Sequence, residues 1–180
     1  MNQKDLELYE KTVLITGATD GMGKETALMF AKVGATVLIH GRNPKKLSEA
    51  LTALRKANPR GQYYSYQADY ASLDDVRSMA NAIKKEHQRI DILINNAGLY
   101  PDKRVITEDG FELTLQVNYL SPFLLTHEMM PLLESSPKAR IVNMASIGHK
   151  LVWNNIRNPK SVTRNHWFLT IMVTEWFSMQ

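Results

Sequence analysis

The chain has 180 residues, with 22 lysines and arginines, 18 aspartates and glutamates, and a formal net charge of +4. Its length suits one domain with one substantial core, and 44% hydrophobic with 22% charged residues excludes wholesale disorder. The absence of cysteine excludes disulfides, thiolate zinc sites and a cysteine nucleophile. Residues 1–11 are polar and no apolar stretch could span a bilayer, so we expect no signal peptide, no transmembrane segment and a cytoplasmic location.

Short apolar runs alternate with longer helical patterns along the chain. The run 12–16 is apolar and β-branched and stops at Gly17, which is typical of a strand buried on both faces. Strands are expected at 12–16, 36–39, 62–67, 90–94 and 140–144. Helices are expected at 21–33, 44–57, 72–85 and 111–133, the last of them bent or re-capped at Pro122. This alternation of buried strands and helices implies right-handed crossovers and a parallel sheet, so the fold class is α/β.

The pattern loses definition after Ser146. All three tryptophans fall in the last 28 residues, and Gly148 is the last glycine. Residues 150–180 contain four basic residues and one acidic residue, so they hold +3 of the net charge of +4. We therefore divide the chain into a main domain, 1–148, and an atypical tail, 149–180, and the basic surplus gives no nucleic-acid signal for the domain.

The strongest local signal is Thr16-Gly17-Ala18-Thr19-Asp20-Gly21-Met22-Gly23, between the first expected strand and the first expected helix. Glycines at this junction let the backbone turn sharply and bring amides close to a pyrophosphate at the helix N-terminus. An isolated match of this kind can also serve only to turn the chain. Its place at the first strand-to-helix junction of an α/β protein favours a nucleotide-binding turn.

Further motifs follow in order along the chain. They are Lys24-Glu25-Thr26-Ala27, Asn95-Asn96-Ala97-Gly98, Val117-Asn118-Tyr119-Leu120 with Phe123-Leu124-Leu125-Thr126, and Ile141-Val142-Asn143-Met144-Ala145-Ser146. Together with the glycine turn they resemble the short-chain dehydrogenase/reductase family, especially its branch related to retinol dehydrogenases, over about residues 11–150. The resemblance implies a Rossmann-type doubly wound parallel sheet with strand order 3-2-1-4-5, in which the last strands of the family fold are missing.

The resemblance also implies a dinucleotide cofactor. In the family an acid after the second strand binds the ribose of NAD, whereas His40-Gly41-Arg42-Asn43 contains no acid and offers a guanidinium to a 2′-phosphate. NADP is therefore expected rather than NAD, although Arg42 could instead be a solvated loop charge and Asp20 stands where some NADP-preferring members carry a base. Asp69 matches the family acid near the adenine amino group. The cofactor-binding residues are expected to be Gly17, Thr19, Asp20, Gly21, Met22, Gly23, Arg42, Asn43, Asp69, Tyr70, Asn96, Ala97 and Gly98.

Catalysis in this family is hydride transfer at nicotinamide C4, assisted by a tyrosine, a lysine, a serine and an asparagine. Ser146 matches the serine and Asn118 matches the asparagine. The tyrosine and lysine should follow the serine as Tyr-x-x-x-Lys, but no tyrosine follows Tyr119 and no lysine follows Lys160. The motifs thus supply half of an active site.

Three interpretations remain open. The chain is a truncated NADP-dependent oxidoreductase for an alcohol or carbonyl substrate, a non-catalytic half-domain that binds a dinucleotide or a partner protein, or a short product without a stable fold. The branch resemblance favours a lipophilic small-molecule substrate and leaves a homo-oligomer open. Scattered histidines give no metal-ligand spacing, and Lys45-Lys46 and Lys84-Lys85 are interpreted as solvated helix faces rather than binding patches.

Overall fold

Five parallel strands form the centre of the molecule in a computed structural model, which describes residues 8–145. The strands are β1 (Thr12–Ile15), β2 (Thr36–Gly41), β3 (Tyr63–Gln67), β4 (Ile92–Asn95) and β5 (Arg140–Asn143). Their order is β3-β2-β1-β4-β5, with Val13 of β1 opposite Val37 of β2 on one side and Ile92 of β4 on the other. The α/β class and the strand order 3-2-1-4-5 predicted from the sequence are therefore confirmed.

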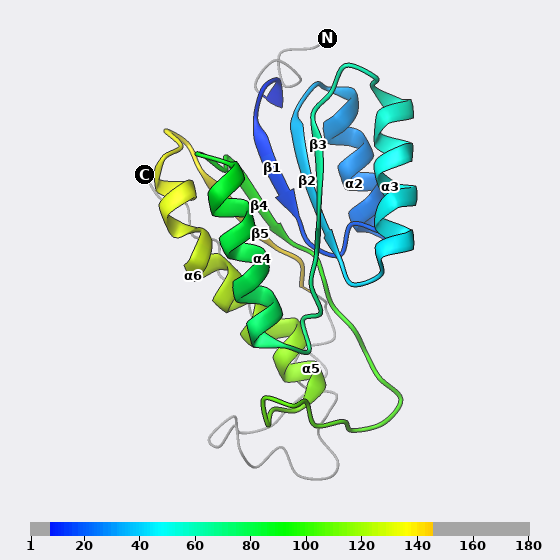
Figure 1. Ribbon diagram of the computed structural model, residues 1–180, viewed down its shortest axis with the longest axis vertical. Helices are drawn as coiled ribbons and strands as arrows, with labels where there is room; N and C mark the ends of the chain where they lie inside the picture. Colours follow the sequence, from blue (N-terminus) through cyan, green and yellow to red (C-terminus); the bar gives the residue numbers. More distant parts are fainter. Residues whose placement is uncertain (1–7, 146–180) are drawn as a thin grey trace.

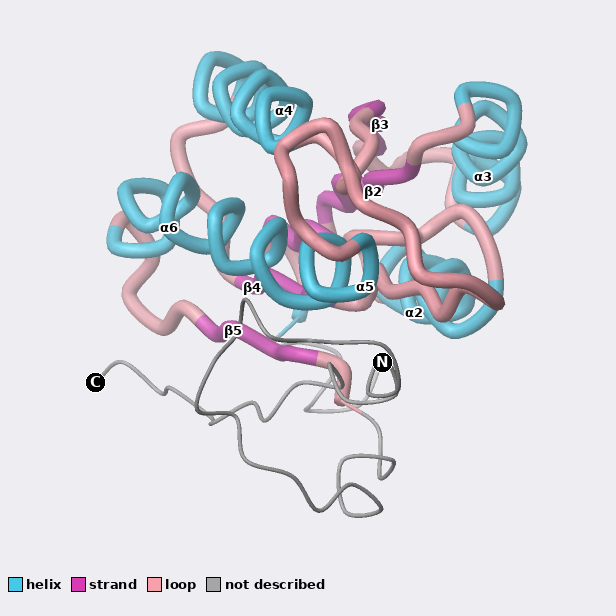
Figure 2. Tube along the Cα trace, turned by 90° about the horizontal axis from the view of Figure 1, so that it is seen from below, coloured by secondary structure: helices cyan, strands magenta, loops and turns pink. Residues whose placement is uncertain are grey.

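Helices cover both faces of this sheet. They are α2 (Gly21–Lys32), α3 (Pro44–Ala57), α4 (Leu73–Glu86), α5 (Leu113–Leu115), the π-helical turn η1 (Gln116–Leu120) and α6 (Ser121–Glu134). Figures 1 and 2 show α2 and α3 side by side on one face, with α4 and α6 together on the other. This is the doubly wound arrangement expected when each strand-to-strand crossover is right-handed.

Each face of the sheet has its own hydrophobic core. Alternate residues of β1 divide between them: Leu14 packs in the core under α4 and α6, while Val13 and Ile15 pack in the core under α2 and α3. All three side chains are fully buried. The continuous apolar strands in the sequence follow from this arrangement, because a central parallel strand has no solvent-facing side.

The helices begin at the side-chain caps that the sequence suggests. The side chain of Asn43 accepts a hydrogen bond from the backbone N–H of Lys46 at the start of α3, and that of Ser72 accepts one from Asp75 at the start of α4. Gly34 follows the end of α2 with φ of 88°, a left-handed conformation that glycine adopts without strain.

The expected helix 111–133 forms as three abutting helical segments over residues 113–134, with a change of hydrogen-bond pattern before Pro122. A short α5 leads into the π-helical turn η1, which ends directly before α6 and its second residue Pro122. Because proline lacks an N–H and its ring clashes with the preceding turn, an unbroken helix through residue 122 would be strained. The bend expected at Pro122 thus takes the form of a wider turn that contains Asn118.

Within residues 8–145, no helix combines the length and apolar character needed to cross a bilayer. The boundary between a domain at 1–148 and a tail at 149–180 lies outside the described residues and remains a prediction.

Candidate cofactor-binding site

A cavity of about 600 Å³ opens at the carboxyl ends of the parallel strands. Turns that follow β1, β3 and β4 contribute its walls, and so does the end of β2. Of the predicted site residues, those that line it are Gly17, Thr19, Asp20, Gly21, Met22, Gly23, Arg42, Asp69, Tyr70, Asn96, Ala97 and Gly98. The cavity therefore brings together predicted site residues that are up to 81 positions apart in the chain, from Gly17 to Gly98.

The glycine turn after β1 is too tightly packed for side chains. Gly17 has φ of 62°, and a Cβ atom there would lie 2.8 Å from the Cα of Ala97. A Cβ atom on Gly23 would lie 2.5 Å from the carbonyl oxygen of Gly17 and would overlap the amide of Asn96. Close packing against the turn after β4 thus requires glycine at both positions, whether the turn binds a nucleotide or only turns the chain.

Asn96 holds this turn from the neighbouring strand end. Its side-chain amide donates hydrogen bonds to the carbonyl oxygens of Thr16 at 2.9 Å and Gly17 at 3.1 Å. In return the hydroxyl of Thr16 accepts hydrogen bonds from the backbone N–H groups of Asn96 and Ala97, each at 3.0 Å. The turns after β1 and β4 are therefore joined by four hydrogen bonds at the floor of the cavity.

The N-terminus of α2 faces the same space. Asp20 caps the helix, because its carboxylate accepts a hydrogen bond from the N–H of Gly21 at 2.9 Å and its carbonyl accepts one from Lys24 at 3.2 Å. Among residues 8–145, the N–H groups of Met22 and Gly23 have no acceptor. Free amides at a helix N-terminus, together with the helix dipole, favour an anion such as a pyrophosphate.

Two cations border the cavity beyond Asp20. Arg42 follows β2, and its guanidinium forms no ion pair within the described part of the chain. The Nζ of Lys46 lies 3.0 Å from a carboxylate oxygen of Asp20, and this hydrogen bond holds the pKa of Asp20 below its usual value. Asn43 lies between the two cations, but its side chain caps α3 and does not line the cavity.

The opposite wall consists of the turn after β3. A carboxylate oxygen of Asp69 accepts a hydrogen bond from the N–H of Ala71 at 2.9 Å, which fixes the turn. Tyr70 is buried, and its ring stacks on that of His40 with centroids 4.5 Å apart and planes 18° apart. The hydroxyl of Ser121 donates to the carbonyl oxygen of Tyr70 at 2.7 Å, so this wall is also tied to the start of α6.

Neither predicted catalytic residue lines the cavity among the described residues. Asn118 lies in η1, and its side chain forms two hydrogen bonds with the backbone of Leu99. Ser146 lies outside the described residues. The roles assigned to both therefore stay predictions.

The cavity also contains residues that sequence reasoning missed. The notable ones are His40, Gly41, Lys46, Leu99 and Val117. Lys46, which the sequence predicts to be solvated, has a half-exposed side chain that bridges α3 to the cap of α2. Lys45 and Lys46 are adjacent in the sequence, and only the packing of α3 against α2 brings Lys46 to this cap.

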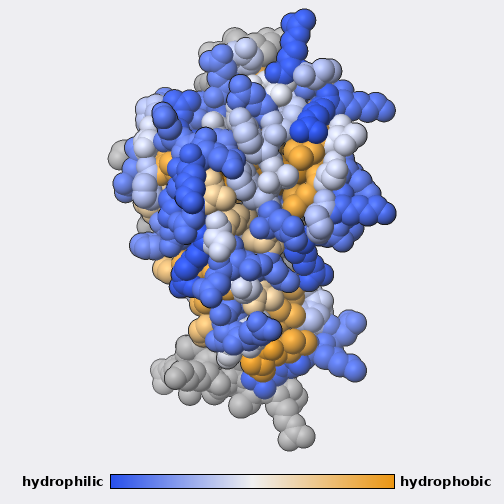
Figure 3. Space-filling model, viewed as in Figure 1, coloured by the Kyte–Doolittle hydropathy of each residue, from blue (hydrophilic) through white to orange (hydrophobic). Residues whose placement is uncertain are grey.

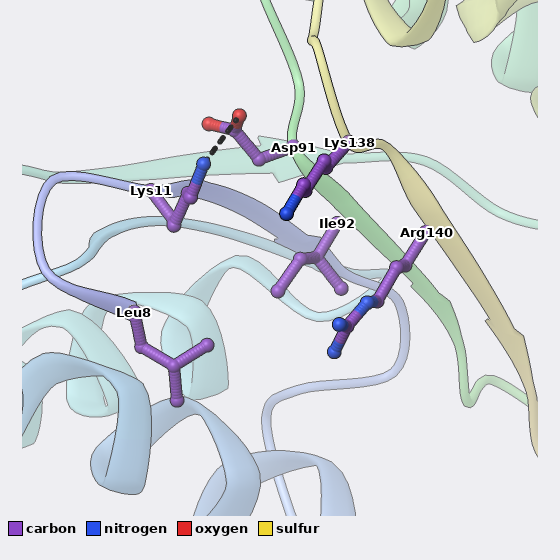
Figure 4. A pocket seen from close by; sticks show the side chains of 6 residues that line it. All are labelled: Leu8, Lys11, Asp91, Ile92, Lys138 and Arg140. Carbon is purple, nitrogen blue, oxygen red and sulfur yellow. Dashed lines mark hydrogen bonds and ion pairs between the residues drawn. The ribbon is translucent and has the colours of Figure 1, made fainter. Parts of the chain in front are cut away.

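A second cavity of about 380 Å³ lies at the opposite, amino ends of the strands. Figure 4 shows the side chains of Lys11, Asp91, Lys138 and Arg140 around it, with Lys11 paired to Asp91. Asp91 is 1% exposed and accepts hydrogen bonds from the N–H of Thr12 at 2.9 Å and the hydroxyl of Ser136 at 2.7 Å. Its carboxylate is thus used to join three segments of the chain.

A parallel sheet in this order, with a glycine turn after the first strand and helices on both faces, defines a doubly wound α/β protein of the Rossmann type. A family model described as short chain dehydrogenase matches residues 11–156. The chain belongs to the short-chain dehydrogenase family.

Its relatives include retinol dehydrogenases. Retinol dehydrogenase 13 of Mus musculus is 40% identical over 139 residues, which are 77% of this chain and 42% of that protein. Retinol dehydrogenase 12 of Bos taurus is 39% identical over 147 residues, 82% of this chain and 46% of that protein. The chain thus spans less than half the length of these two relatives.

Solved structures show the same fold. A structure described as a short chain dehydrogenase from Escherichia coli CFT073 complexed with NADPH aligns with a TM-score of 0.70 and 30% identity, over 86% of this chain and 65% of that one. The short chain dehydrogenase from Shigella flexneri aligns with a TM-score of 0.71 and 28% identity, over 86% of this chain and 62% of that one.

Proposed function

We propose that this chain is the NADP(H)-binding part of an oxidoreductase that interconverts an alcohol and a carbonyl compound. The observation that carries the proposal is the charge at the end of β2, where Arg42 and Lys46 border the cavity and Arg42 has no carboxylate partner among residues 8–145. A guanidinium can bind a phosphate through two parallel hydrogen bonds, and an ammonium adds a point charge. The 2′-phosphate that distinguishes NADP from NAD is the group such a pair would recognise.

The residues that line the cavity support a dinucleotide as its ligand. The N–H groups of Met22 and Gly23 would hold the pyrophosphate, and the absence of a Cβ atom at Gly17 and Gly23 lets the backbone turn beneath it. Arg42 and Lys46 would hold the 2′-phosphate, and Asp69 would face the adenine end. The bound cofactor would supply or accept a hydride at nicotinamide C4.

The proton chemistry is incomplete in these 180 residues. Ser146 would polarise a substrate carbonyl and Asn118 would support a proton relay, as the family resemblance implies. No tyrosine follows Tyr119 and no lysine follows Lys160 in the sequence, so the family's proton donor and the cation that lowers its pKa are not present. We therefore propose that the 180-residue chain binds the cofactor without turning over a carbonyl substrate.

An apolar substrate is supported by the surface next to the site. Figure 3 shows apolar side chains gathered at the end of the molecule where α5 lies in Figure 1. Exposed apolar residues of the segment that leads into α5 are Val105, Ile106 and Phe111. The relatives named for retinol act, by that name, on a lipophilic alcohol, which agrees with such a surface.

The test is a comparison of NADPH and NADH binding by calorimetry or fluorescence enhancement. We expect NADPH to bind at least about tenfold more tightly, since charge-assisted hydrogen bonds to a phosphate contribute roughly 1.5–3 kcal/mol. Arg42→Ala should remove most of this preference and leave NADH binding unchanged. Arg60→Ala, an exposed arginine in the turn between α3 and β3, is the matched control. Equal binding of the two cofactors by the unmodified chain would show that the assignment of NADP is wrong.

A further inference from the structure

His40 is a buried, titratable side chain that the proposed chemistry does not use. It is 3% exposed and lies near the end of β2, under the glycine turn and against the turn that follows β3. A histidine in such a place must satisfy both ring nitrogens within the protein, because an unpaired buried polar atom is costly.

Both ring nitrogens of His40 have partners, and the partners differ in kind. The N–H of Gly17 donates a hydrogen bond to Nδ1 at 3.4 Å, and Nε2 lies 3.1 Å from the carbonyl oxygen of Ala68. A backbone N–H can only donate and a carbonyl oxygen can only accept. The surroundings therefore require the neutral ring with its proton on Nε2, because a proton on Nδ1 would face the N–H of Gly17.

The two contacts join separate walls of the cofactor cavity. Gly17 belongs to the glycine turn, and its neighbour Ala18 donates its N–H to the backbone carbonyl of His40 at 3.0 Å. Ala68 belongs to the turn after β3, where Tyr70 stacks on the imidazole. His40 thus accepts hydrogen bonds from the N–H groups of Gly17 and Ala18 in the glycine turn. Its ring also contacts Ala68 in the turn after β3, which forms the opposite wall of the cavity.

The direction of these N–H groups matters for the site. The N–H groups of Gly17 and Ala18 are bound to His40 and therefore point toward β2. Among residues 8–145, the N–H groups of Met22 and Gly23 at the start of α2 have no acceptor and belong to residues that line the cavity. If Gly17 lost this acceptor, its partly buried N–H would lose the hydrogen bond that fixes the direction of the turn.

We propose that His40, as the neutral Nε2-protonated tautomer, is a positioning residue that holds the glycine turn in the conformation that binds the cofactor, an inference that rests on the proposed function. The contact to Gly17 sets the turn, and the contact to Ala68 and the stacking on Tyr70 hold the imidazole itself in place. His40 touches no reacting atom in this scheme.

The electrostatic surroundings keep the ring neutral. Burial, the largest influence, lowers the pKa of His40 to about 4, although the hydrogen bond to Ala68 and the nearby carboxylate of Asp69 raise it. The titratable groups that face the ring are Asp69 and the phenol of Tyr70, both from the turn after β3. At neutral pH the geometry and the surroundings thus require the same protonation state.

Two conservative variants separate the two contacts. In His40→Asn the side-chain oxygen takes the place of Nδ1, so the acceptor for Gly17 is kept and the donor to Ala68 is lost. In His40→Gln the side-chain amide takes the place of Nε2, so the donor to Ala68 is kept and the acceptor for Gly17 is lost. Both variants remove the stacked ring, so they serve as controls for each other.

NADPH affinity, the melting temperature without cofactor and hydrogen exchange at the Gly17 amide are measured for the wild-type chain and both variants. We expect both variants to melt at similarly reduced temperatures, while only His40→Gln weakens NADPH binding, by about tenfold. The Gly17 amide should exchange faster in His40→Gln than in His40→Asn. Equal NADPH affinities in the two variants would overturn the proposal.

Nitrogen NMR of the wild-type chain measures the protonation state and tautomer of His40 without any cofactor. At about pH 6, below the ordinary histidine value of about 6.5, His40 should show a neutral ring with the proton on Nε2. An imidazolium or a proton on Nδ1 would overturn the inference about His40 even if NADPH binds. A wild-type chain with the expected tautomer that binds neither NADPH nor NADH would instead overturn the proposed function, and with it the cofactor role of His40.

Discussion

The side chain of Asn118 forms a closed pair of hydrogen bonds with the backbone of Leu99. The carboxamide oxygen of Asn118 accepts from the N–H of Leu99 at 2.9 Å, and its amide nitrogen donates to the carbonyl oxygen of Leu99 at 3.0 Å. The π-helical turn η1 is thereby fastened to the segment that follows the Asn-Asn-Ala-Gly turn. Asn118 thus satisfies both backbone polar groups of Leu99, which lies outside the strands within residues 8–145. This is a structural role beside the catalytic one predicted for Asn118.

Replacement of Asn118 should therefore reduce stability. We expect Asn118→Ala to lower the free energy of unfolding by about 1–3 kcal/mol, because both backbone groups of Leu99 lose their partner. Asn118→Asp should cost at least as much, since a carboxylate would face the carbonyl oxygen of Leu99. Urea unfolding followed by circular dichroism measures both. Asn81→Ala, an exposed position on α4, is the control, and an equal loss there would contradict the assignment.

The ion pair between Asp20 and Lys46 predicts a second effect, on cofactor affinity. Asp20→Asn keeps an N-cap side chain on α2 but removes a negative charge from the place where a 2′-phosphate is proposed and frees Lys46 from its partner. We expect the variant to bind NADPH about two- to fivefold more tightly and NADH unchanged, with a smaller gain at high salt. Calorimetric titration with both cofactors measures this, and Glu134→Gln at the far end of α6 controls for net charge. A gain shared by NADH would exclude a specific effect on the phosphate.

The fold could be predicted from the sequence because its signals are local. Runs such as Ile92–Ile94 are apolar throughout and can be satisfied only in a sheet covered on both faces, and caps such as Asn43 and Ser72 mark helix starts within a few residues. The glycine turn was equally readable, since close backbone approach restricts Gly17 and Gly23 to glycine.

The contacts between segments could not be predicted in the same way. Nothing in the residues around His40 shows that its ring would lie between Gly17 and Ala68, which are 23 and 28 positions away. Lys46 is likewise one of two adjacent lysines in the sequence, and only the crossing of α3 and α2 distinguishes it from Lys45. Such roles depend on side-chain direction in the folded chain, which periodicity alone does not specify.

The packing around Gly23 makes a third prediction. Gly23→Ala should lower the free energy of unfolding by about 1–3 kcal/mol and abolish measurable NADPH binding, because the new Cβ atom would overlap the carbonyl of Gly17 and the amide of Asn96. Gly98→Ala is the control for stability, since its Cβ atom would meet Asn118 at an ordinary 3.5 Å. Thermal unfolding compares the two variants, and NADPH titration compares Gly23→Ala with the unmodified chain. Equal melting temperatures of Gly23→Ala and Gly98→Ala would show that the glycine turn accommodates the added Cβ atom.

Asp91 makes a prediction about acid stability. Its carboxylate is 1% exposed, and burial alone would raise its pKa. Hydrogen bonds from Thr12 and Ser136 and the charges of Lys11 and Arg89 outweigh burial, so the pKa of Asp91 in the folded chain lies below its usual value. A group whose pKa is lower in the folded state binds a proton less readily there than in the unfolded state.

The sign of the pH effect follows from this difference. The stability that ionised Asp91 contributes should be fully present above about pH 5 and should fall as the pH drops through the unfolded value of about 3.9 toward the lower folded value. Asp91→Asn should lower the free energy of unfolding at neutral pH by about 2–4 kcal/mol, since a buried partner of Lys11 and Arg89 loses its charge. It should also flatten the acid limb of the stability curve.

Urea unfolding between about pH 3 and pH 7 checks both effects of the Asp91 substitution. Asp74→Asn is the matched control, because that carboxylate is 92% exposed and its ion pair is with Arg77 on the same helix. The control should change the free energy of unfolding by less than about 0.5 kcal/mol at any pH. If the free energy of unfolding fell equally steeply at low pH in Asp91→Asn and in the unmodified chain, other carboxylates would be responsible for the acid sensitivity.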